Sequence, residues 1–157
     1  MIRSRNADFV RALRAGAFAG LAGAILLDGY RLFLAYISAG ALPEDHYRYV
    51  ASALLGSAAY ALPGAAYLGV LIHVALAVSW ACGFAWIALH SSDVATKPIV
   101  SGAFFGVVVY VVTRLMTFAA GIAQPDTPRA AFVELVAHTV FFGVPVALIV
   151  TARLRSA

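Results

Sequence analysis

Four long apolar runs, separated by short polar segments, dominate the chain. The runs lie at about residues 15–37, 64–89, 98–122 and 130–152. A transmembrane helix needs about 20 mainly apolar residues to cross the hydrocarbon core of a bilayer, and each run meets that length. The pattern predicts an all-α, polytopic membrane protein in which residues 1–157 form a single domain, a bundle of four transmembrane helices.

Composition supports the membrane assignment. The chain is 63% hydrophobic and only 11% charged, whereas a soluble domain carries roughly 25% charged residues. Such a chain cannot cover a water-facing surface with polar groups. We therefore expect the lipid bilayer to be its principal partner and its solvent.

Basic residues are placed at the ends of the chain, before the first run and after the last. Cytoplasmic segments of membrane proteins carry an excess of Lys and Arg, so both termini are predicted to be cytoplasmic. Lys97, between the second and third runs, agrees, and the loop with Asp126 and Arg129 then faces outward. The basic residues form no patch of the kind that binds nucleic acid. The terminal arginines are Arg3, Arg5, Arg11, Arg14, Arg153 and Arg155.

The N-terminal arginines and the first apolar run also resemble a cleavable signal peptide. Signal peptides have a short, uninterrupted apolar region. The first run is long, and Asp28 and Arg31 interrupt it. We therefore expect it to be a membrane span.

The predicted outer loop between the first two runs, residues 38–62, is long. Pro43 can open a helix and Gly56 can close it, so a short interfacial helix is expected at about 43–56. Two interpretations stay open for this segment: a packed connecting loop, or a lid over the outward face. His46, within it, is expected to be solvated or interfacial.

Two of the runs share a small-residue motif. Gly16-Ala-Phe-Ala-Gly20 in the first run matches Gly102-Ala-Phe-Phe-Gly106 in the third. Small residues at this spacing let helix backbones approach closely in lipid. The four glycines are therefore predicted helix-packing positions, within the chain or against a second copy in a homodimer.

Ionisable residues also recur at matching places. Asp28 and Arg114 each lie twelve residues after the first glycine of the motif, and His73 and His138 end two six-residue segments that align. The matches suggest two helical hairpins repeated about an axis along the membrane normal, which is a parallel repeat.

Six ionisable residues interrupt the apolar runs and form a predicted intramembrane polar site. Counted inward from the outer ends at about 1.5 Å per residue, they lie in one layer at depths of roughly 6 to 14 Å. Ionisable groups in hydrocarbon are costly unless they are paired or hydrated, so they mark candidate functional sites. Their formal charges cancel. The residues are Asp28, Arg31, His73, Arg114, Glu134 and His138.

Several interpretations of this layer stay open. Glu134 and His138, one helical turn apart, fit a pathway for protons or small solutes, or a ligand site. No cofactor is expected, but His73, Glu134 and His138 are weak candidates for zinc ligands, and His73 and His138 for haem ligands. Arg31 and Arg114 oppose a cation there. Alternatively, the buried charges only lock the helices together, and the protein acts in assembly.

Catalytic motifs are missing from the sequence. It contains no Gly-rich phosphate loop, nucleophile elbow or cysteine cluster. The single cysteine, Cys82, lies inside the second run and is expected to be a small packed residue. The sequence therefore indicates no enzyme class.

A set of short motifs occurs together in the last three runs: His73, the pair Gly102 and Gly106, Arg114, the pair Glu134 and His138, and the terminal Arg153 and Arg155. With these motifs, residues 67–154 resemble the YagU-like family of small, uncharacterised bacterial inner-membrane proteins. Family members tend to have histidine where Arg114 stands, so the position is a poor choice for a metal or haem ligand. The resemblance implies a multi-pass protein of the bacterial inner membrane with a four-helix fold, and it supplies no activity.

Overall fold

A computed structural model of the chain describes residues 5–40, 42–122 and 127–156. Helices make up nearly all of these residues, and none of them forms a β-strand. Four helices are long and apolar enough to cross a membrane, which confirms the predicted all-α, four-helix membrane fold. Arg3 and Asp126, used above to orient the chain, lie outside the described residues.

The four spans follow one another along the chain. The first begins well before the apolar run that predicted it, and the fourth is one continuous helix made of three segments. They are α1 (Arg5–Ala39), α3 (Ala65–His90), α5 (Pro98–Ala119), and the fourth span, composed of α6 (Pro128–Ala137), the π-helical turn η2 (His138–Gly143) and α7 (Val144–Ser156).

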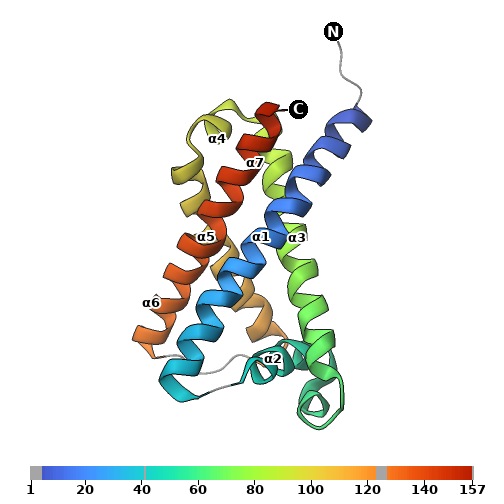
Figure 1. Cartoon of the computed structure of the whole chain (residues 1–157), viewed down its shortest axis with the longest axis vertical. Helices are drawn as coiled ribbons and strands as arrows, with labels where there is room; N and C mark the ends of the chain where they lie inside the picture. The colour runs from blue at the N-terminus through green and yellow to red at the C-terminus, as the bar shows by residue number, and fades with distance from the viewer. Residues whose placement is uncertain (1–4, 41, 123–126, 157) are drawn as a thin grey trace.

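The connections lie at opposite ends of the bundle (Figure 1). The beginning of α1, the end of α7 and the short helix α4 (Ser92–Thr96) lie at one end, called here the terminal end. Helix α2 (Pro43–Leu55) and the 3₁₀ turn η1 (Gly56–Tyr60) lie at the other, the loop end. Pro43 occupies the first turn of α2 and Gly56 caps its C-terminus, because proline suits the first turn and glycine tolerates the positive φ of the cap.

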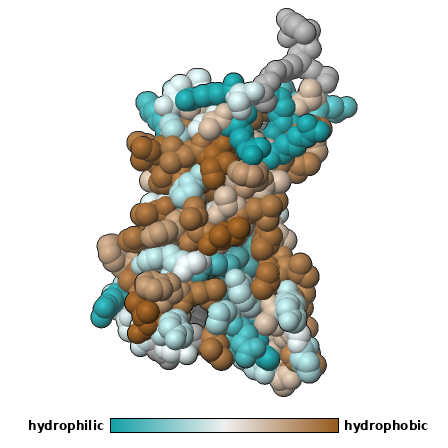
Figure 2. Space-filling model, viewed as in Figure 1, coloured by the Kyte–Doolittle hydropathy of each residue, from teal (hydrophilic) through white to brown (hydrophobic). Residues whose placement is uncertain are grey.

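The outer surface suits a lipid environment. Figure 2 shows hydrophilic residues gathered at the terminal end, with a mainly hydrophobic surface along the middle of the bundle. Large apolar side chains stand out from the spans there, among them Ile25, Phe104 and Phe118, which are all more than two-thirds exposed. In water this surface would be unfavourable, but in lipid it costs nothing.

Glycines bring the helices of each hairpin into backbone contact. A Cβ atom on Gly20 of α1 would lie 2.6 Å from the Cα of Val78 in α3. A Cβ atom on Gly106 of α5 would lie 2.6 Å from the Cα of Thr139 in the fourth span. The other glycine of each motif, Gly16 or Gly102, likewise faces the second helix of its own hairpin.

Each glycine motif therefore allows close contact between the two helices of its own hairpin, which is what the suggested repeat requires. All four glycines face neighbours within the chain, so their small surfaces are already used. A homodimer stays a prediction, and it would have to form through another surface.

The fourth span changes from α-helix to a π-helical turn just before Pro145. Proline lacks an N–H and collides with the carbonyl four residues earlier, here that of Phe141. Widening of the turn is one way to accommodate that collision, and such turns are rare and frequently found at functional sites. His138 is the first residue of this turn.

Arginines at the terminal end join the first and last helices. Arg11 Nη2 donates a hydrogen bond to the carbonyl oxygen of Leu154 at 3.0 Å. The guanidinium of Arg153 lies 3.6 Å from the centre of the Phe18 ring, a cation–π contact. These residues, expected only to orient the chain in the membrane, therefore also close the bundle.

We predict that Gly106→Ala destabilises the protein by about 1–3 kcal/mol, the usual cost of overpacking a tight contact. The added methyl group would press against the backbone of His138 and Thr139. Thermal unfolding in detergent, followed by circular dichroism, measures the loss. Gly83→Ala is the matched control, since a Cβ on Gly83 has no neighbour within 4 Å. Equal stability of the two variants would contradict the assigned contact.

Candidate functional site

A cavity of about 640 Å³ lies among the helices in the loop half of the bundle. Its walls are mainly apolar side chains of α3 and α5, and its volume falls in the range of roughly 300–1,000 Å³ found for small-molecule sites. Polar and ionisable residues interrupt these walls: Arg31, His46, Tyr49, His73, Tyr110, Thr113, Arg114, Thr117, Glu134 and His138.

Five of the six residues of the polar layer predicted from the sequence line the cavity. Arg31, His73, Arg114, Glu134 and His138 all line it, although they come from four different spans. Asp28, the sixth member of the predicted layer, is absent from the lining and contacts His73 instead. The helical spacing that predicts these five side chains to point into the bundle therefore also places them around one cavity.

Aromatic side chains form the floor of the cavity toward the terminal end. The ring of Phe105 in α5 packs against Phe84 at 4.9 Å, Phe142 at 5.9 Å and Trp80 at 6.5 Å between ring centres. Trp80 and Phe142 are also part of the cavity wall. The lining of the cavity reaches no farther toward the terminal end than Leu27, Trp80, Val109 and Phe142.

Helix α2 forms the wall at the loop end. His46, Tyr49, Val50 and Ala53 all line the cavity, and they fall on one helical stripe because their spacing is i, i+3, i+4 and i+7. Gly69 of α3 lets α2 come this close, since a Cβ there would collide with the backbone carbonyl of Tyr47. The segment packs against α3 and also lines the cavity, so both interpretations, a packed connecting loop and a lid over the outward face, stay predictions.

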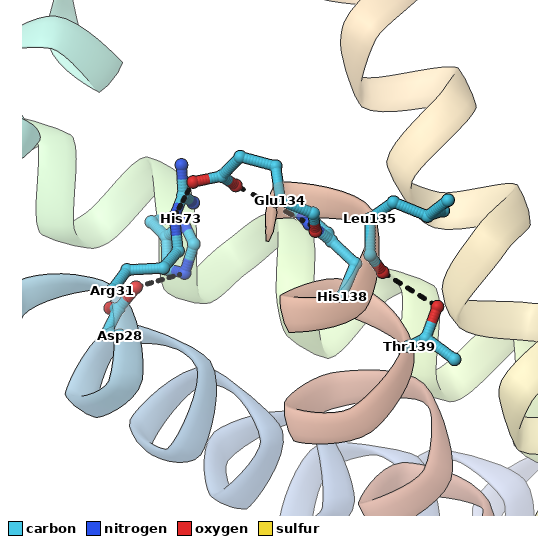
Figure 3. Close-up of polar contacts among 7 residues, drawn as sticks. All are labelled: Asp28, Arg31, His73, Glu134, Leu135, His138 and Thr139. Atoms are coloured by element: carbon cyan, nitrogen blue, oxygen red, sulfur yellow. Dashed lines mark hydrogen bonds and ion pairs between the residues drawn. The ribbon is translucent and has the colours of Figure 1, made fainter. Parts of the chain in front are cut away.

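An ion pair crosses from α1 to the fourth span (Figure 3). Arg31 Nε donates to Glu134 Oε1 at 3.2 Å, and the two side chains keep 23% and 31% of their exposure. His138 Nδ1 lies farther from the carboxylate of Glu134, at 3.8 Å, and 2.8 Å from the backbone oxygen of the same residue. Because a carbonyl only accepts, Nδ1 of His138 carries the proton in that bond. The Glu134 carboxylate therefore lies closer to the guanidinium of Arg31 than to the imidazole of His138.

A second polar group joins α1, α2 and α3. His73 Nε2 lies 3.0 Å from Asp28 Oδ1, as the dashed line in Figure 3 marks, and Tyr47 donates its hydroxyl proton to Asp28 Oδ2 at 2.8 Å. Burial, together with the hydrogen bond to Asp28, raises the pKa of Tyr47 to about 12. The hydroxyl therefore stays protonated and holds one carboxylate oxygen.

His46 is the residue of this group that sequence reasoning missed. It was expected to be solvated or interfacial, and it is partly buried, with its ring centre 6.1 Å from that of His73. Burial and the positive charge of Arg31 lower the pKa of His46 to about 4, so its imidazole is neutral near pH 7. The stripe of α2 residues that lines the cavity was the signal that could have placed it.

The residues predicted as weak zinc ligands fall into two groups. His73 lies beside Asp28 and His46, whereas Glu134 lies beside Arg31. His73 and His138, the candidate haem ligands, both line the cavity. Haem ligation stays a prediction.

Comparisons with protein-family models, with curated proteins and with solved structures give no match to this chain. The resemblance to the YagU-like family stays a prediction.

We predict that Arg31→Gln and Glu134→Gln each lower the stability of the protein, and that the double variant loses less than the sum of the two. The Arg31–Glu134 contact joins α1 to α6, and polar contacts between membrane helices contribute on the order of 1 kcal/mol. Unfolding free energies of the four proteins of a double-mutant cycle measure the coupling. A coupling energy near zero would show that the pair does not hold the helices.

Proposed function

We propose that this multi-pass membrane protein binds a small, largely apolar solute that carries an acidic group. The observation that carries the proposal is the cavity of about 640 Å³, in which ionisable residues from four spans interrupt apolar walls. Ligand sites have this composition, because apolar walls supply affinity and a few polar groups supply orientation. A bundle stabilised only by buried charge pairs needs no such space.

The charge of the lining favours an acidic ligand. Arg31 and Arg114 are positive and Glu134 is negative, so these groups sum to +1 when the histidines are neutral. A carboxylate is a natural partner for arginine, which binds it through paired N–H groups. Between membrane helices the effective dielectric constant is lower than in bulk water, so this attraction is stronger than at a water-exposed surface.

The direction of access follows from the proposed orientation. Arginines cluster at the terminal end, so we place that end in the cytoplasm and the loop end outside, in the inner membrane of a bacterium. The solute would then enter from the outer side or from the lipid, past α2. The aromatic floor of Trp80, Phe84, Phe105 and Phe142 separates the cavity from the cytoplasmic end.

A structural role is the second candidate, and the ion pair of Arg31 with Glu134 favours it. In that case the polar layer would lock the helices, and the protein would act through assembly with a membrane partner. Proton handling by Glu134 and His138 is a narrower form of the first candidate. A pH-sensitive dye trapped in proteoliposomes tests it, because Glu134→Gln should then abolish a proton flux that the wild type shows.

We predict that the cavity is reached by water from outside. In a Cys82→Ala background, a cysteine replacing Thr113, which lines the cavity, should react with a membrane-impermeant thiosulfonate added outside intact cells. A cysteine replacing Leu115 should not react, because that side chain faces outward from α5 and is 61% exposed to the lipid. Equal, negligible labelling at both positions would contradict an open site and favour the structural role.

We also predict that 1-naphthoate slows the labelling of the cysteine at position 113, and that the neutral analogue 1-naphthylmethanol does so less. The carboxylate supplies the acidic group, and the ring fills the apolar part of the cavity. Adding Arg114→Gln should weaken protection by naphthoate about tenfold, which corresponds to about 1.4 kcal/mol. Equal protection by both compounds would contradict the proposed charge preference.

A further inference from the structure

Three potential metal ligands from separate helices converge at the loop end of the cavity. Asp28 of α1, His46 of α2 and His73 of α3 each offer one ligand atom, and these atoms all lie within 4.8 Å of one another. Two of these atoms, His73 Nε2 and Asp28 Oδ1, are separated by 3.0 Å. Residues far apart in the chain are therefore already assembled as a ligand set.

Three atoms of this group lack a hydrogen bond of good geometry among the described residues, although His73 Nε2 and Asp28 Oδ1 lie 3.0 Å apart as an ion pair. Asp28 Oδ1, His46 Nε2 and His73 Nε2 are all buried, and none has a hydrogen bond of good geometry. Buried polar atoms are nearly always satisfied in folded proteins, so each exception requires an explanation. A cation bound among these three residues, whose ligand atoms lie within 4.8 Å of one another, would give all three atoms a common partner.

We propose that Asp28, His46 and His73 bind one divalent transition-metal ion, for which Zn²⁺ is the test. Two imidazoles and one carboxylate are a ligand set typical of catalytic zinc and of non-haem Fe(II). His46 and His73 also line the cavity, so a further coordination position would face it. This inference does not depend on which solute the cavity takes.

The surroundings of the three ligands are those of a supported metal site. Tyr47 donates to Asp28 Oδ2 at 2.8 Å, which leaves Oδ1 directed toward the histidines. Such outer hydrogen bonds orient ligating carboxylates and raise metal affinity. Gly69, one turn before His73, permits the contact with the backbone of Tyr47 and so keeps His46 close to α3.

The nearby positive charge is compensated. Arg31 acts electrostatically on His46 and would oppose a cation, but Glu134 lies 3.2 Å from its guanidinium. The carboxylate of Asp28 adds one negative charge within the ligand set. Asp28, Arg31 and Glu134 sum to a formal charge of −1, and with Arg114 of α5 the four groups are neutral, so no net positive charge opposes a divalent cation.

Binding requires only small side-chain shifts: His73 Nε2 and Asp28 Oδ1, now 3.0 Å apart, separate slightly, and His46 moves closer to them. Ligand atoms around a tetrahedral zinc ion with bonds of about 2.0–2.1 Å lie about 3.4 Å apart. Since the present atoms lie within 4.8 Å, a shift on the order of 1 Å in the His46 side chain completes the geometry. α2 lies outside the four spans, so this ligand can move without repacking the bundle.

The test uses tag-free, full-length protein that has been stripped of metal with a chelator. After incubation with Zn²⁺ and desalting, elemental analysis should find one zinc per chain in the wild type and far less in His46→Gln. Tyr47→Phe should keep the ligands but lower zinc affinity about tenfold, as the loss of an outer hydrogen bond does. His46 lies outside the spans, and size-exclusion chromatography confirms that its variant stays folded.

His90→Gln and His138→Gln serve as controls. His90 lies at the end of α3 with Nδ1 on the carbonyl of Trp86, and His138 belongs to the other polar group. Both variants should bind zinc as the wild type does. Wild-type protein without stoichiometric zinc, or zinc that is lost in His138→Gln and kept in His46→Gln, would overturn the proposal.

Discussion

The structure depends on close backbone contact at two glycine motifs in the terminal half of the bundle. Gly16 and Gly20 seat α3 against α1, and Gly102 and Gly106 seat the fourth span against α5. Dispersion and close packing drive helix association in lipid, since the hydrophobic effect does not act between lipid-exposed helices. Contact at one end leaves the helices free to diverge at the other, and the cavity occupies that space.

The half of the bundle that holds the cavity can accommodate ionisable side chains within a membrane. Ionisable groups there face one another or the cavity instead of lipid, which avoids the cost of isolated charges in hydrocarbon. Helix α2 completes the enclosure from outside the spans, and Gly69 sets how closely it approaches. The aromatic cluster around Phe105 closes the opposite side. An apolar chamber with a polar wall results, in a chain of only 157 residues.

The two hairpins share a scaffold but carry different chemistry. In the first hairpin, Asp28 and His73 come together at 3.0 Å. In the second, Arg114 takes the place of Asp28, and His138 bonds to the backbone of its own helix and packs beside Tyr110 at 5.6 Å between rings. The first hairpin therefore carries a carboxylate–imidazole group, whereas the second has an arginine at the corresponding position of its sequence motif. This division explains how an acidic solute and a metal ion could share one cavity.

The hydrophobic pattern alone determined the four spans and the all-α fold, because a bilayer allows few other structures for long apolar runs. Helical spacing also placed five members of the polar layer, such as Arg31 and Glu134, toward the interior that became the cavity. The sequence could not predict which of these side chains pair with one another. Glu134 and His138 are neighbours by spacing, yet the carboxylate meets Arg31 from α1. His46 joined Asp28 and His73 only because α2 folds back over the bundle. Such contacts depend on how helices cross and how loops return, and no local pattern encodes that geometry.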